Sequence, residues 1–547
     1  MALIAVPMAL AGQAAAAVYA MLGAFTTTFG RNFPYARRGR VLALVAVVMT
    51  ACVGGGTALG VWARPQDGGV GAAVVVAAMA VVAGAAKLGC DAARLRGLGA
   101  VLLLFAFAVS AYGAPAPSDV LTRTALAALG AVVAWALAML GRFAHPERPQ
   151  RLAVAVALRE LAGLLDAGTG SGGGEPGTGT GSGGGTDRLA RHQATAAVLE
   201  AHRALGLPPA TATERGRDGG PCVRLAAISW TVLIRSASRP PDLPAAMAGH
   251  LRGQAVLLLA RRRGQPDLLP DLAALAEISE GTEPAAPARS DASLERRAGV
   301  LTLGRRADPA GRASRRAVLL VPALRMTVGT GLAGGAALLL GLGHGYWAAI
   351  SAAAVLHSIN VRTAAQRAVQ RTLGTAAGLA LALAVLALHP GPLTLVLIIV
   401  LLEFLLEYGV AHNYGIGVVF LTPLALLMSD LATPVPAEDL VQDRALGSVV
   451  GIVVALLCAL VLIHGRAAER VRRALTACGT AAELAERALR NPDASTLPEL
   501  RSRLAAAVVE LREADDAAAG ELWPAELDPT ELAAAEQRAY RILRRLG

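Results

Sequence analysis

The sequence predicts an all-α, polytopic membrane protein with two six-helix transmembrane blocks and helical cytoplasmic segments. Of its 547 residues, 54% are hydrophobic and only 17% are charged, a balance far to the apolar side of soluble domains. The apolar residues fall into two groups of stretches, near 1–13, 14–30, 41–62, 70–87, 97–113 and 121–141, and near 317–342, 345–360, 372–388, 392–408, 413–430 and 444–463. Several are shorter than the about 20 residues of a perpendicular span, so we expect about 10 to 12 tilted or broken spans in a lipid bilayer.

Basic residues support this partition, because cytoplasmic connections collect Arg and Lys whereas translocated connections do not. The clusters recur after every second stretch: Arg31, Arg37, Arg38 and Arg40; Lys87, Arg94 and Arg96; Arg142, Arg148 and Arg151; Arg362 and Arg367; and Arg466, Arg470, Arg472 and Arg473. The intervening connections, such as 389–392, are poor in basic residues. We therefore expect a multi-pass protein of the cell inner (plasma) membrane with cytoplasmic N- and C-termini.

This pattern divides the chain into four parts. Residues 1–141 form the first transmembrane block and residues 316–465 the second. Between them, residues 142–315 are a cytoplasmic helical segment interrupted by a Gly/Ser linker at 168–185, a composition that cannot build a core. Residues 466–547 form a cytoplasmic helical tail.

The net charge of +11 follows from this topology. Most basic residues lie between or after the apolar stretches without interleaved aromatics, so no nucleic-acid partner is expected. The five cysteines are dispersed, without a C-x-x-C pair or nearby histidine ligands, so neither a metal site nor another cofactor is expected. The sequence leaves open whether the protein forms a homo-oligomer.

Short internal repeats indicate that the blocks are related. Arg371-Thr-Leu-Gly-Thr-Ala-Ala-Gly378 recurs as Arg444-Ala-Leu-Gly-Ser-Val-Val-Gly451. Tyr19-Ala-Met-Leu-Gly-Ala-Phe in the first block, followed by an Arg cluster and an apolar stretch, echoes Trp347-Ala-Ala-Ile in the second. An even number of spans between the two copies makes them parallel repeats.

Three motifs of the second block carry a family resemblance: Gly345-Tyr-Trp-Ala-Ala-Ile, His357-Ser-Ile-Asn-Val-Arg-Thr and Gln370-Arg-Thr-Leu-Gly-Thr-Ala-Ala-Gly378. They resemble the fusaric acid resistance protein-like (FUSC) family of integral membrane transporters, and Asn413-Tyr414 and Thr422-Pro423 extend the match. The first block is similar more loosely, through Leu22-Gly-Ala-Phe-Thr-Thr-Thr-Phe-Gly-Arg31. The resemblance implies anion transport of the type seen in exporters of aromatic carboxylic acids.

Arginines at membrane depth are candidates for the transport path, because a charge there is costly unless it faces a cavity or a partner. Arg325 lies inside an apolar stretch, where it either pairs with a substrate anion or carboxylate or extends to the headgroups. Arg367 and Arg371 are four residues apart and share a helix face, as a carboxylate site or as positive-inside anchors.

Glu403 and Glu407 are also four apart, in an otherwise apolar stretch. They suit proton coupling, because a buried carboxylate can load and release protons, or they form structural ion pairs with arginine. Asn413, Tyr414 and Thr422 supply neutral hydrogen-bonding groups that line the path or bond between helices.

No phosphate-binding loop and no H-E-x-x-H motif occurs in the sequence, which disfavours an ATP-driven pump and a membrane metalloenzyme. A non-enzymatic transporter for efflux of organic (aromatic carboxylate) anions, with or without proton coupling, is the prediction that fits these features. A passive anion channel and a membrane scaffold for envelope proteins are the alternatives.

Overall fold

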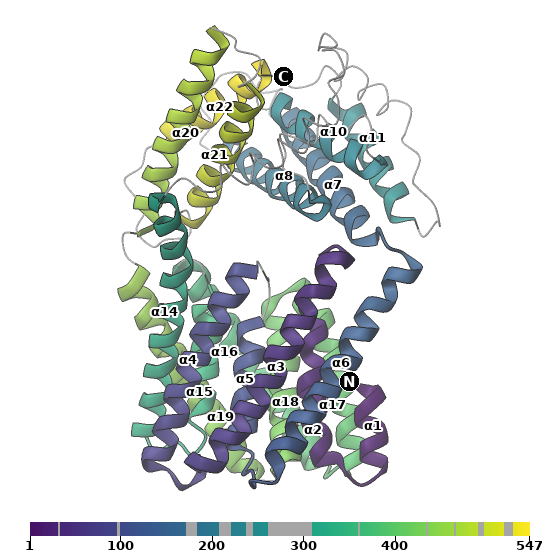
Figure 1. Cartoon of the computed structure of the whole chain (residues 1–547), viewed down its shortest axis with the longest axis vertical. Coiled ribbons are helices and arrows are strands. Elements are labelled where there is room, and N and C mark those ends of the chain that lie inside the picture. The colour runs from purple at the N-terminus through teal and green to yellow at the C-terminus, as the bar shows by residue number, and fades with distance from the viewer. Residues whose placement is uncertain are drawn as a thin grey trace.

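A computed structural model describes residues 1–30, 33–93, 95, 99–170, 183–206, 220–236, 244–260, 309–358, 361–433, 436–463, 466–490, 497–518 and 529–546. Within these residues the regular structure is helical, which confirms the predicted all-α class. Figure 1 shows two layers: a bundle of long helices, and a separate layer of helices at one end of it, which we call the cap. The end of the bundle away from the cap is called the distal end.

The first block contributes six α-helices and two 3-10 turns to the bundle. They are α1 (Ala2–Leu10), α2 (Ala14–Ala24), η1 (Phe25–Thr28), α3 (Tyr35–Ala63), η2 (Pro65–Asp67), α4 (Gly69–Ala93), α5 (Gly99–Tyr112) and α6 (Asp119–Ala144). The second block contributes α14 (Pro309–Leu339), α15 (Tyr346–Leu356), α16 (Val361–Ala387), α17 (Pro392–His412), α18 (Tyr414–Ala432) and α19 (Ala437–Ile463). Seven helices of the described chain, α3, α4, α6 and α16 to α19, are long and apolar enough to span a membrane.

Three helices near the centre of the bundle are too short to span a bilayer alone. The helix α15 has 11 residues, about 16 Å at 1.5 Å per residue, against about 30 Å of hydrocarbon. The helices α2 and α5 have 11 and 14 residues. Every residue of α5 and α15 is buried, so longer helices shield them from lipid. Both therefore place side chains inside the bundle.

The two blocks pack in the same way, as the parallel repeats in the sequence predict. In the first block α2 packs on α6 and α3 on α5; in the second, α15 packs on α19 and α16 on α18. Across the blocks, α4 contacts α14 and α17 contacts α1. Parallel repeats related by an axis along the membrane normal give this arrangement.

Glycines set the same close approach in both blocks. A Cβ on Gly130 of α6 would meet the carbonyl oxygen of Ala20, and a Cβ on Gly451 of α19 would meet that of Ala348. Small residues at such crossings let membrane helices approach to backbone contact. The two contacts fix a residue-by-residue correspondence between α2 and α15 and between α6 and α19.

The cap has a separate hydrophobic core. Its described helices are α7 (Arg148–Gly170), α8 (Gly183–Leu205), α10 (Pro221–Ser236), α11 (Pro244–Leu259), α20 (Arg466–Arg490), α21 (Leu497–Ala518) and α22 (Pro529–Arg545). Ion pairs link helices of the cap, including Arg538 with Glu486 at 2.8 Å and Arg512 with Glu536. The C-terminus lies in the cap, whereas the N-terminal residue lies beside the bundle (Figure 1).

Several boundaries differ from the sequence prediction. The helix α6 continues to Ala144 and α14 begins at Pro309, beyond the predicted block limits of 141 and 316. The ends of the predicted Gly/Ser linker, 168–170 and 183–185, are helical because α7 and α8 extend into them. Its centre, 171–182, lies outside the described residues. Because most of the stability of a helix in a protein comes from tertiary packing, a packed helix can continue for a few residues of low helix propensity at its end.

A buried histidine makes the cap sensitive to pH. His202 on α8 is buried against Trp230, and its Nδ1 lies 2.8 Å from the carbonyl oxygen of Val198. Burial lowers the pKa of His202 below its ordinary value of 6.5. The unfolded cap therefore binds more protons, so the stability gained from neutral His202 is present above about pH 6.5 and is lost as the pH falls toward the folded-state pKa.

We expect hydrogen exchange in α8 and α10 of the full-length protein to accelerate between pH 7.5 and pH 5.5, after correction for intrinsic exchange. His202→Gln, which cannot titrate, is expected to remove this excess acceleration. An unchanged pH response in His202→Gln would show that another group controls it.

Candidate functional site

Two arginines lie inside the second block. Arg371 on α16 is 0% exposed and Arg444 on α19 is 1% exposed. The two guanidinium groups are close enough to repel each other electrostatically. Burying one charge in a membrane protein is costly, and burying two like charges together costs more. Such an arrangement indicates a site that an anion completes.

Hydroxyl groups surround Arg371. Its Nη1 donates to the Tyr414 hydroxyl at 3.4 Å, and its Nη2 donates to the Ser351 hydroxyl at 3.2 Å. The Ser351 hydroxyl is in turn 3.4 Å from that of Ser448. These partners are neutral, so they orient the guanidinium and leave its charge uncompensated.

Arg444 lies over an aromatic ring. Its guanidinium carbon is 4.2 Å from the ring centroid of Trp347, which provides a cation-π contact. The Nε and Nη1 atoms of Arg444 and the Nε atom of Arg371 are buried without a hydrogen-bond partner among the described residues. None of the hydrogen bonds described for either arginine involves a carboxylate. Unpaired buried N–H donors of this kind are expensive unless a ligand binds them.

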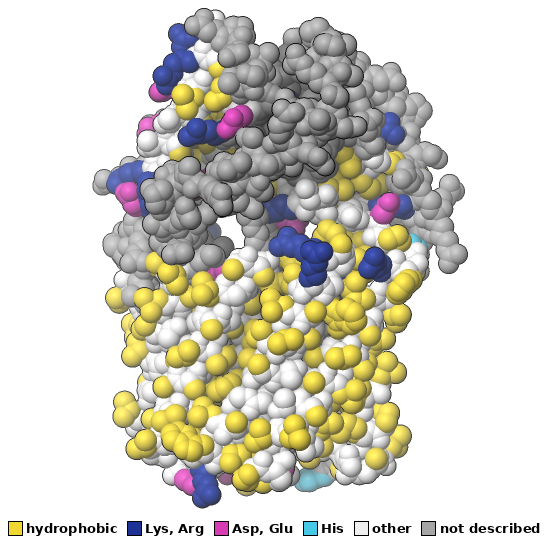
Figure 2. All heavy atoms as spheres, in the orientation of Figure 1, with side chains coloured by type: hydrophobic (Ala, Val, Ile, Leu, Met, Phe, Trp, Pro, Cys, Tyr) yellow, Lys and Arg dark blue, Asp and Glu magenta, His cyan; other side chains and the backbone are white. Residues whose placement is uncertain are grey.

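A third arginine continues the series toward the cap. Arg367, one helical turn before Arg371 on α16, is half-buried, and its guanidinium carbon lies 5.3 Å from the ring centroid of Tyr414. Tyr414 therefore contacts both arginines. Figure 2 shows that further Lys and Arg side chains gather where the bundle meets the cap. Positive charge thus extends from the cap side of the bundle to its interior.

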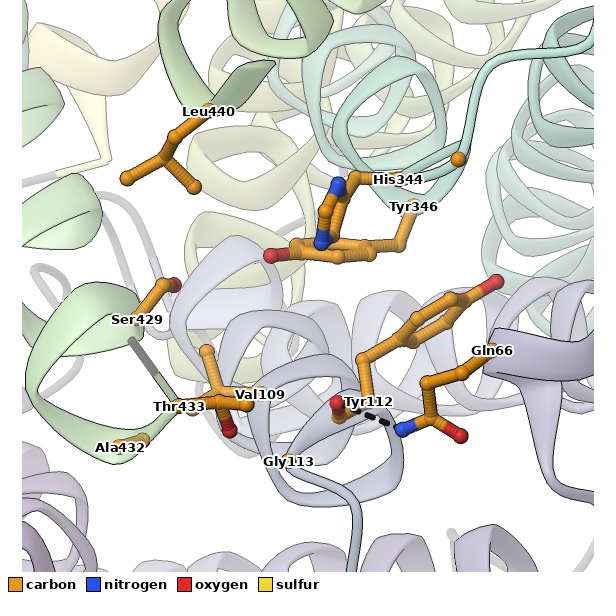
Figure 3. A pocket seen from close by; sticks show the side chains of 11 residues that line it. Gln66, Val109, Tyr112, Gly113, His344, Tyr346, Ser429, Ala432, Thr433 and Leu440 are labelled. Carbon is orange, nitrogen blue, oxygen red and sulfur yellow. Dashed lines mark hydrogen bonds between the residues drawn. The ribbon is translucent and has the colours of Figure 1, made fainter. Parts of the chain in front are cut away.

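A pocket of about 290 Å³ opens at the distal end of the bundle, between residues of both blocks. It is lined by Gln66, Val109, Tyr112, Gly113, Gly343, His344, Tyr346, Ser429, Ala432, Thr433 and Leu440 (Figure 3). The Tyr112 and Tyr346 rings form one wall, with centroids 4.7 Å apart. The hydroxyl groups of Tyr346 and Ser429 point toward each other across the space.

A histidine and an aspartate meet at this pocket. The Nδ1 of His344 lies 2.6 Å from Oδ2 of Asp443, and the His344 backbone N–H donates to the same oxygen at 3.2 Å. Asp443 precedes Arg444 in the chain, yet its carboxylate bonds to His344. Leu440, one helical turn before Arg444 on α19, lines the same pocket.

The structure brings together only part of the predicted site. Arg371 and Tyr414 lie in the buried cluster, and Arg367 lies beside it. Arg325 instead donates from Nη2 to the carbonyl oxygens of Leu356 at 2.8 Å and Ser358 at 2.5 Å. These carbonyls lie at the C-terminal end of α15, where a cation satisfies otherwise unpaired acceptors.

Two other predicted residues have local contacts. The Asn413 side chain caps α18 by accepting the Gly415 N–H at 2.7 Å. Thr422 is buried on α18, where Gly378 of α16 packs closely on it. Glu403 and Glu407 are half-buried on α17. The residue that follows each of them in the sequence, Phe404 and Tyr408, is aromatic and exposed.

Sequence reasoning did not select Arg444, Trp347, Ser351 or Ser448 as site residues. A signal for Arg444 was present, because the motif that begins at Arg371 recurs at Arg444. Ser448 lies in the same recurring motif. Ser351 carried no such signal, because its polar contacts depend on the crossing of α15 with α19.

The first block holds a reduced counterpart of the site. The glycine contacts align Gly130 with Gly451 on α6 and α19, and Ala20 with Ala348 on α2 and α15. In this alignment Arg123 corresponds to Arg444 and Tyr19 to Trp347. Arg123 indeed lies over Tyr19, with 4.6 Å between its guanidinium carbon and the ring centroid. In place of Ser351 and Ser448 the first block has Gly23 and Ala127, which touch directly.

The counterpart of Arg371 follows from the crossings of α3 with α5 and of α16 with α18. Gly56 approaches the carbonyl of Phe107, as Gly374 approaches that of Gly415. This pairs Arg371 with Val53, a buried apolar residue. The first block thus keeps one arginine on an aromatic ring and lacks the second arginine.

Fold and site together define a polytopic helical membrane protein with a cationic site in its second block. Residues 332–458 match the fusaric acid resistance protein-like family, which confirms the resemblance for this block. The chain is similar to an uncharacterized membrane protein, YvaC, of Bacillus subtilis (strain 168), with 32% identity over 202 residues. That alignment covers 35% of this chain and 31% of YvaC, so the chain matches about a third of the length of this relative. No solved structure matches the chain.

Proposed function

We propose that the protein transports organic anions through its second block, by efflux of aromatic carboxylates. The observation that carries the proposal is the pair of buried arginines, Arg371 and Arg444, which among the described residues have unpaired N–H groups and no carboxylate as a hydrogen-bond partner. A carboxylate that enters this site would accept charge-assisted hydrogen bonds and relieve the repulsion between the two cations. The match to the fusaric acid resistance protein-like family supports the same class of function.

The charge distribution supports an inner-membrane orientation. Basic residues concentrate at the cap end of the bundle, and by the positive-inside rule this supports a cytoplasmic position for the cap. Arg367 would then attract anions from the cytoplasm, and the distal pocket would face the other side. Substrate would pass from Arg367 to the buried pair and leave through the pocket.

Proton coupling is the finer part of the proposal, and Glu403 and Glu407 are its candidates. Half-buried carboxylates on a membrane helix are suited to bind protons in one state and release them in another. The passive anion channel is the second candidate function, because three successive arginines could also line a pore that needs no proton.

Flux of radiolabelled benzoate in proteoliposomes, with and without a pH gradient, separates these functions. We expect gradient-dependent uptake that Glu407→Gln uncouples, whereas Glu438→Gln, at an exposed residue of α19, behaves as wild type. Flux independent of the gradient and equal in all three proteins would favour the channel. Absence of flux for benzoate, malate and chloride alike would contradict transport and favour a scaffold.

A further inference from the structure

In the first block, the arginine Arg123 is paired with a carboxylate. The Oδ2 atom of Asp119 lies 2.8 Å from Nη2 of Arg123, while the same arginine lies over Tyr19. Asp119 is one helical turn before Arg123, on the same face of α6. The first block is therefore a complete arrangement of aromatic ring, arginine and carboxylate.

The second block has an aromatic ring and an arginine at the corresponding positions, Trp347 and Arg444, without the carboxylate at the position of Asp119. The correspondence that pairs Arg123 with Arg444 pairs Asp119 with Leu440, one turn before Arg444 on α19. Leu440 is 1% exposed and lines the distal pocket. The position that Asp119 occupies in the first block thus borders an open space in the second.

From this internal comparison we infer that the distal pocket binds the substrate, with its carboxylate on Arg444 in the place that Asp119 fills beside Arg123. The inference rests on the proposed anion transport and adds where and how the anion binds. Arg444 supplies unpaired buried N–H groups, and a carboxylate accepts two parallel N–H bonds from one guanidinium.

The volume and the lining residues of the pocket indicate the chemistry of the ligand beyond its carboxylate. Its volume of about 290 Å³ is at the small end of ligand sites, which suits a single ring. The Tyr112 and Tyr346 rings, tilted by 43° to each other, form an aromatic wall, against which another ring packs favourably in an offset or tilted arrangement. The hydroxyl group of Ser429 borders the opposite side, and the amide of Gln66 lies beside Tyr112, where it donates to the Tyr112 carbonyl oxygen at 2.8 Å. A small aromatic monocarboxylate is the ligand class that these groups fit.

The comparison further implies one such site per chain. In the first block Asp119 already occupies the position beside Arg123, so a free carboxylate would have to displace a tethered one. The effective concentration of a tethered group on the same helix is high. The first block therefore supports the second and does not bind a substrate of its own.

Leu440→Asp tests the inference by supplying the second block with its own tethered carboxylate. We expect benzoate binding to purified full-length protein, measured by calorimetry, to weaken at least about tenfold relative to Leu440→Asn, which has the same shape without the charge. Benzoate flux should fall in parallel. Equal affinity in the two variants, whether both retain or both lose binding, would overturn the inference, because the carboxylate would then have no specific effect.

A second variant introduces the charge after folding. Leu440→Cys, treated with a methanethiosulfonate reagent that attaches a negative sulfonate, is expected to lose benzoate binding, whereas attachment of a neutral methylthio group is expected to preserve most of it. Wild type treated with both reagents is the control for the five native cysteines. Equal effects of the two reagents would again overturn the inference. Wild-type protein that neither binds nor transports benzoate would contradict the proposed function itself, a result distinct from these.

Discussion

Arg371→Met is expected to abolish most benzoate transport while raising the thermal stability of the protein. Arg371 is fully buried and repelled by Arg444. Methionine has a similar length and no charge, so it removes the repulsion and the desolvation cost. Replacing buried ion pairs with apolar residues of similar volume is often neutral or stabilises proteins by about 1–4 kcal/mol. Loss of activity with gain of stability is typical of residues kept for function.

The loss of function should exceed tenfold. Hydrogen bonds between charged partners contribute about 1.5–3 kcal/mol each, which corresponds to about 10- to 100-fold in affinity or flux. Arg362→Met, at an exposed arginine on the same helix, is the matched control and should change flux by less than about twofold, since exposed charges contribute little. Transport retained in Arg371→Met, or a drop in stability to match lost transport, would refute the assigned role.

Gly56→Leu is expected to prevent correct assembly of the bundle, whereas Gly55→Leu is expected to be tolerated. A Cβ on Gly56 would meet the carbonyl oxygen of Phe107 and, at 3.2 Å, the Cβ of Ser110. A Cβ on Gly55 meets nothing within 4 Å and the residue is exposed. Overpacking costs about 1–3 kcal/mol even where side chains can adjust, and here the obstacle is the backbone of α5.

Size-exclusion profiles and thermal unfolding in detergent measure the difference between these neighbouring variants. Gly56→Leu should aggregate or unfold several degrees below wild type, and Gly55→Leu should elute and unfold as wild type does. Similar behaviour of the two variants would show that the α3–α5 crossing is looser than the structure indicates.

Much of the fold could be predicted from the sequence, because the bilayer imposes long apolar stretches and the positive-inside rule orders them. Both six-helix groups appear where the apolar stretches lie, and the repeats at Arg371 and Arg444 correspond to related helices. Helix ends were harder to predict. The helices α7 and α8 extend into the Gly-rich ends of the predicted linker, which composition alone does not reveal.

The site was predicted less completely, since it depends on which helices cross. Periodicity placed Arg367 and Arg371 on one face of α16, and this face does meet Tyr414. Its position inside an apolar stretch also made Arg325 a candidate substrate ligand, but the carbonyls at the end of α15 bind its side chain. Their position depends on where the helix α15 ends.

The distal pocket was not predictable, because its walls come from helix ends and connections of both blocks that are far apart in sequence. Gln66 follows α3, Tyr112 ends α5, and His344 precedes α15. Each is unremarkable in its own segment. Only the pairing of the two blocks brings them together around one space, next to Arg444.

Calorimetric titration of the purified wild-type protein with benzoate and with benzamide tests the central claim most directly. The two molecules have the same ring and nearly the same shape, and only benzoate carries a negative charge. A site formed by buried, unpaired arginines predicts saturable binding of about one benzoate per chain and at least about 100-fold weaker binding of benzamide. Equal binding of the two compounds, or benzoate binding that persists when Arg371 and Arg444 are both replaced by methionine, would contradict the account.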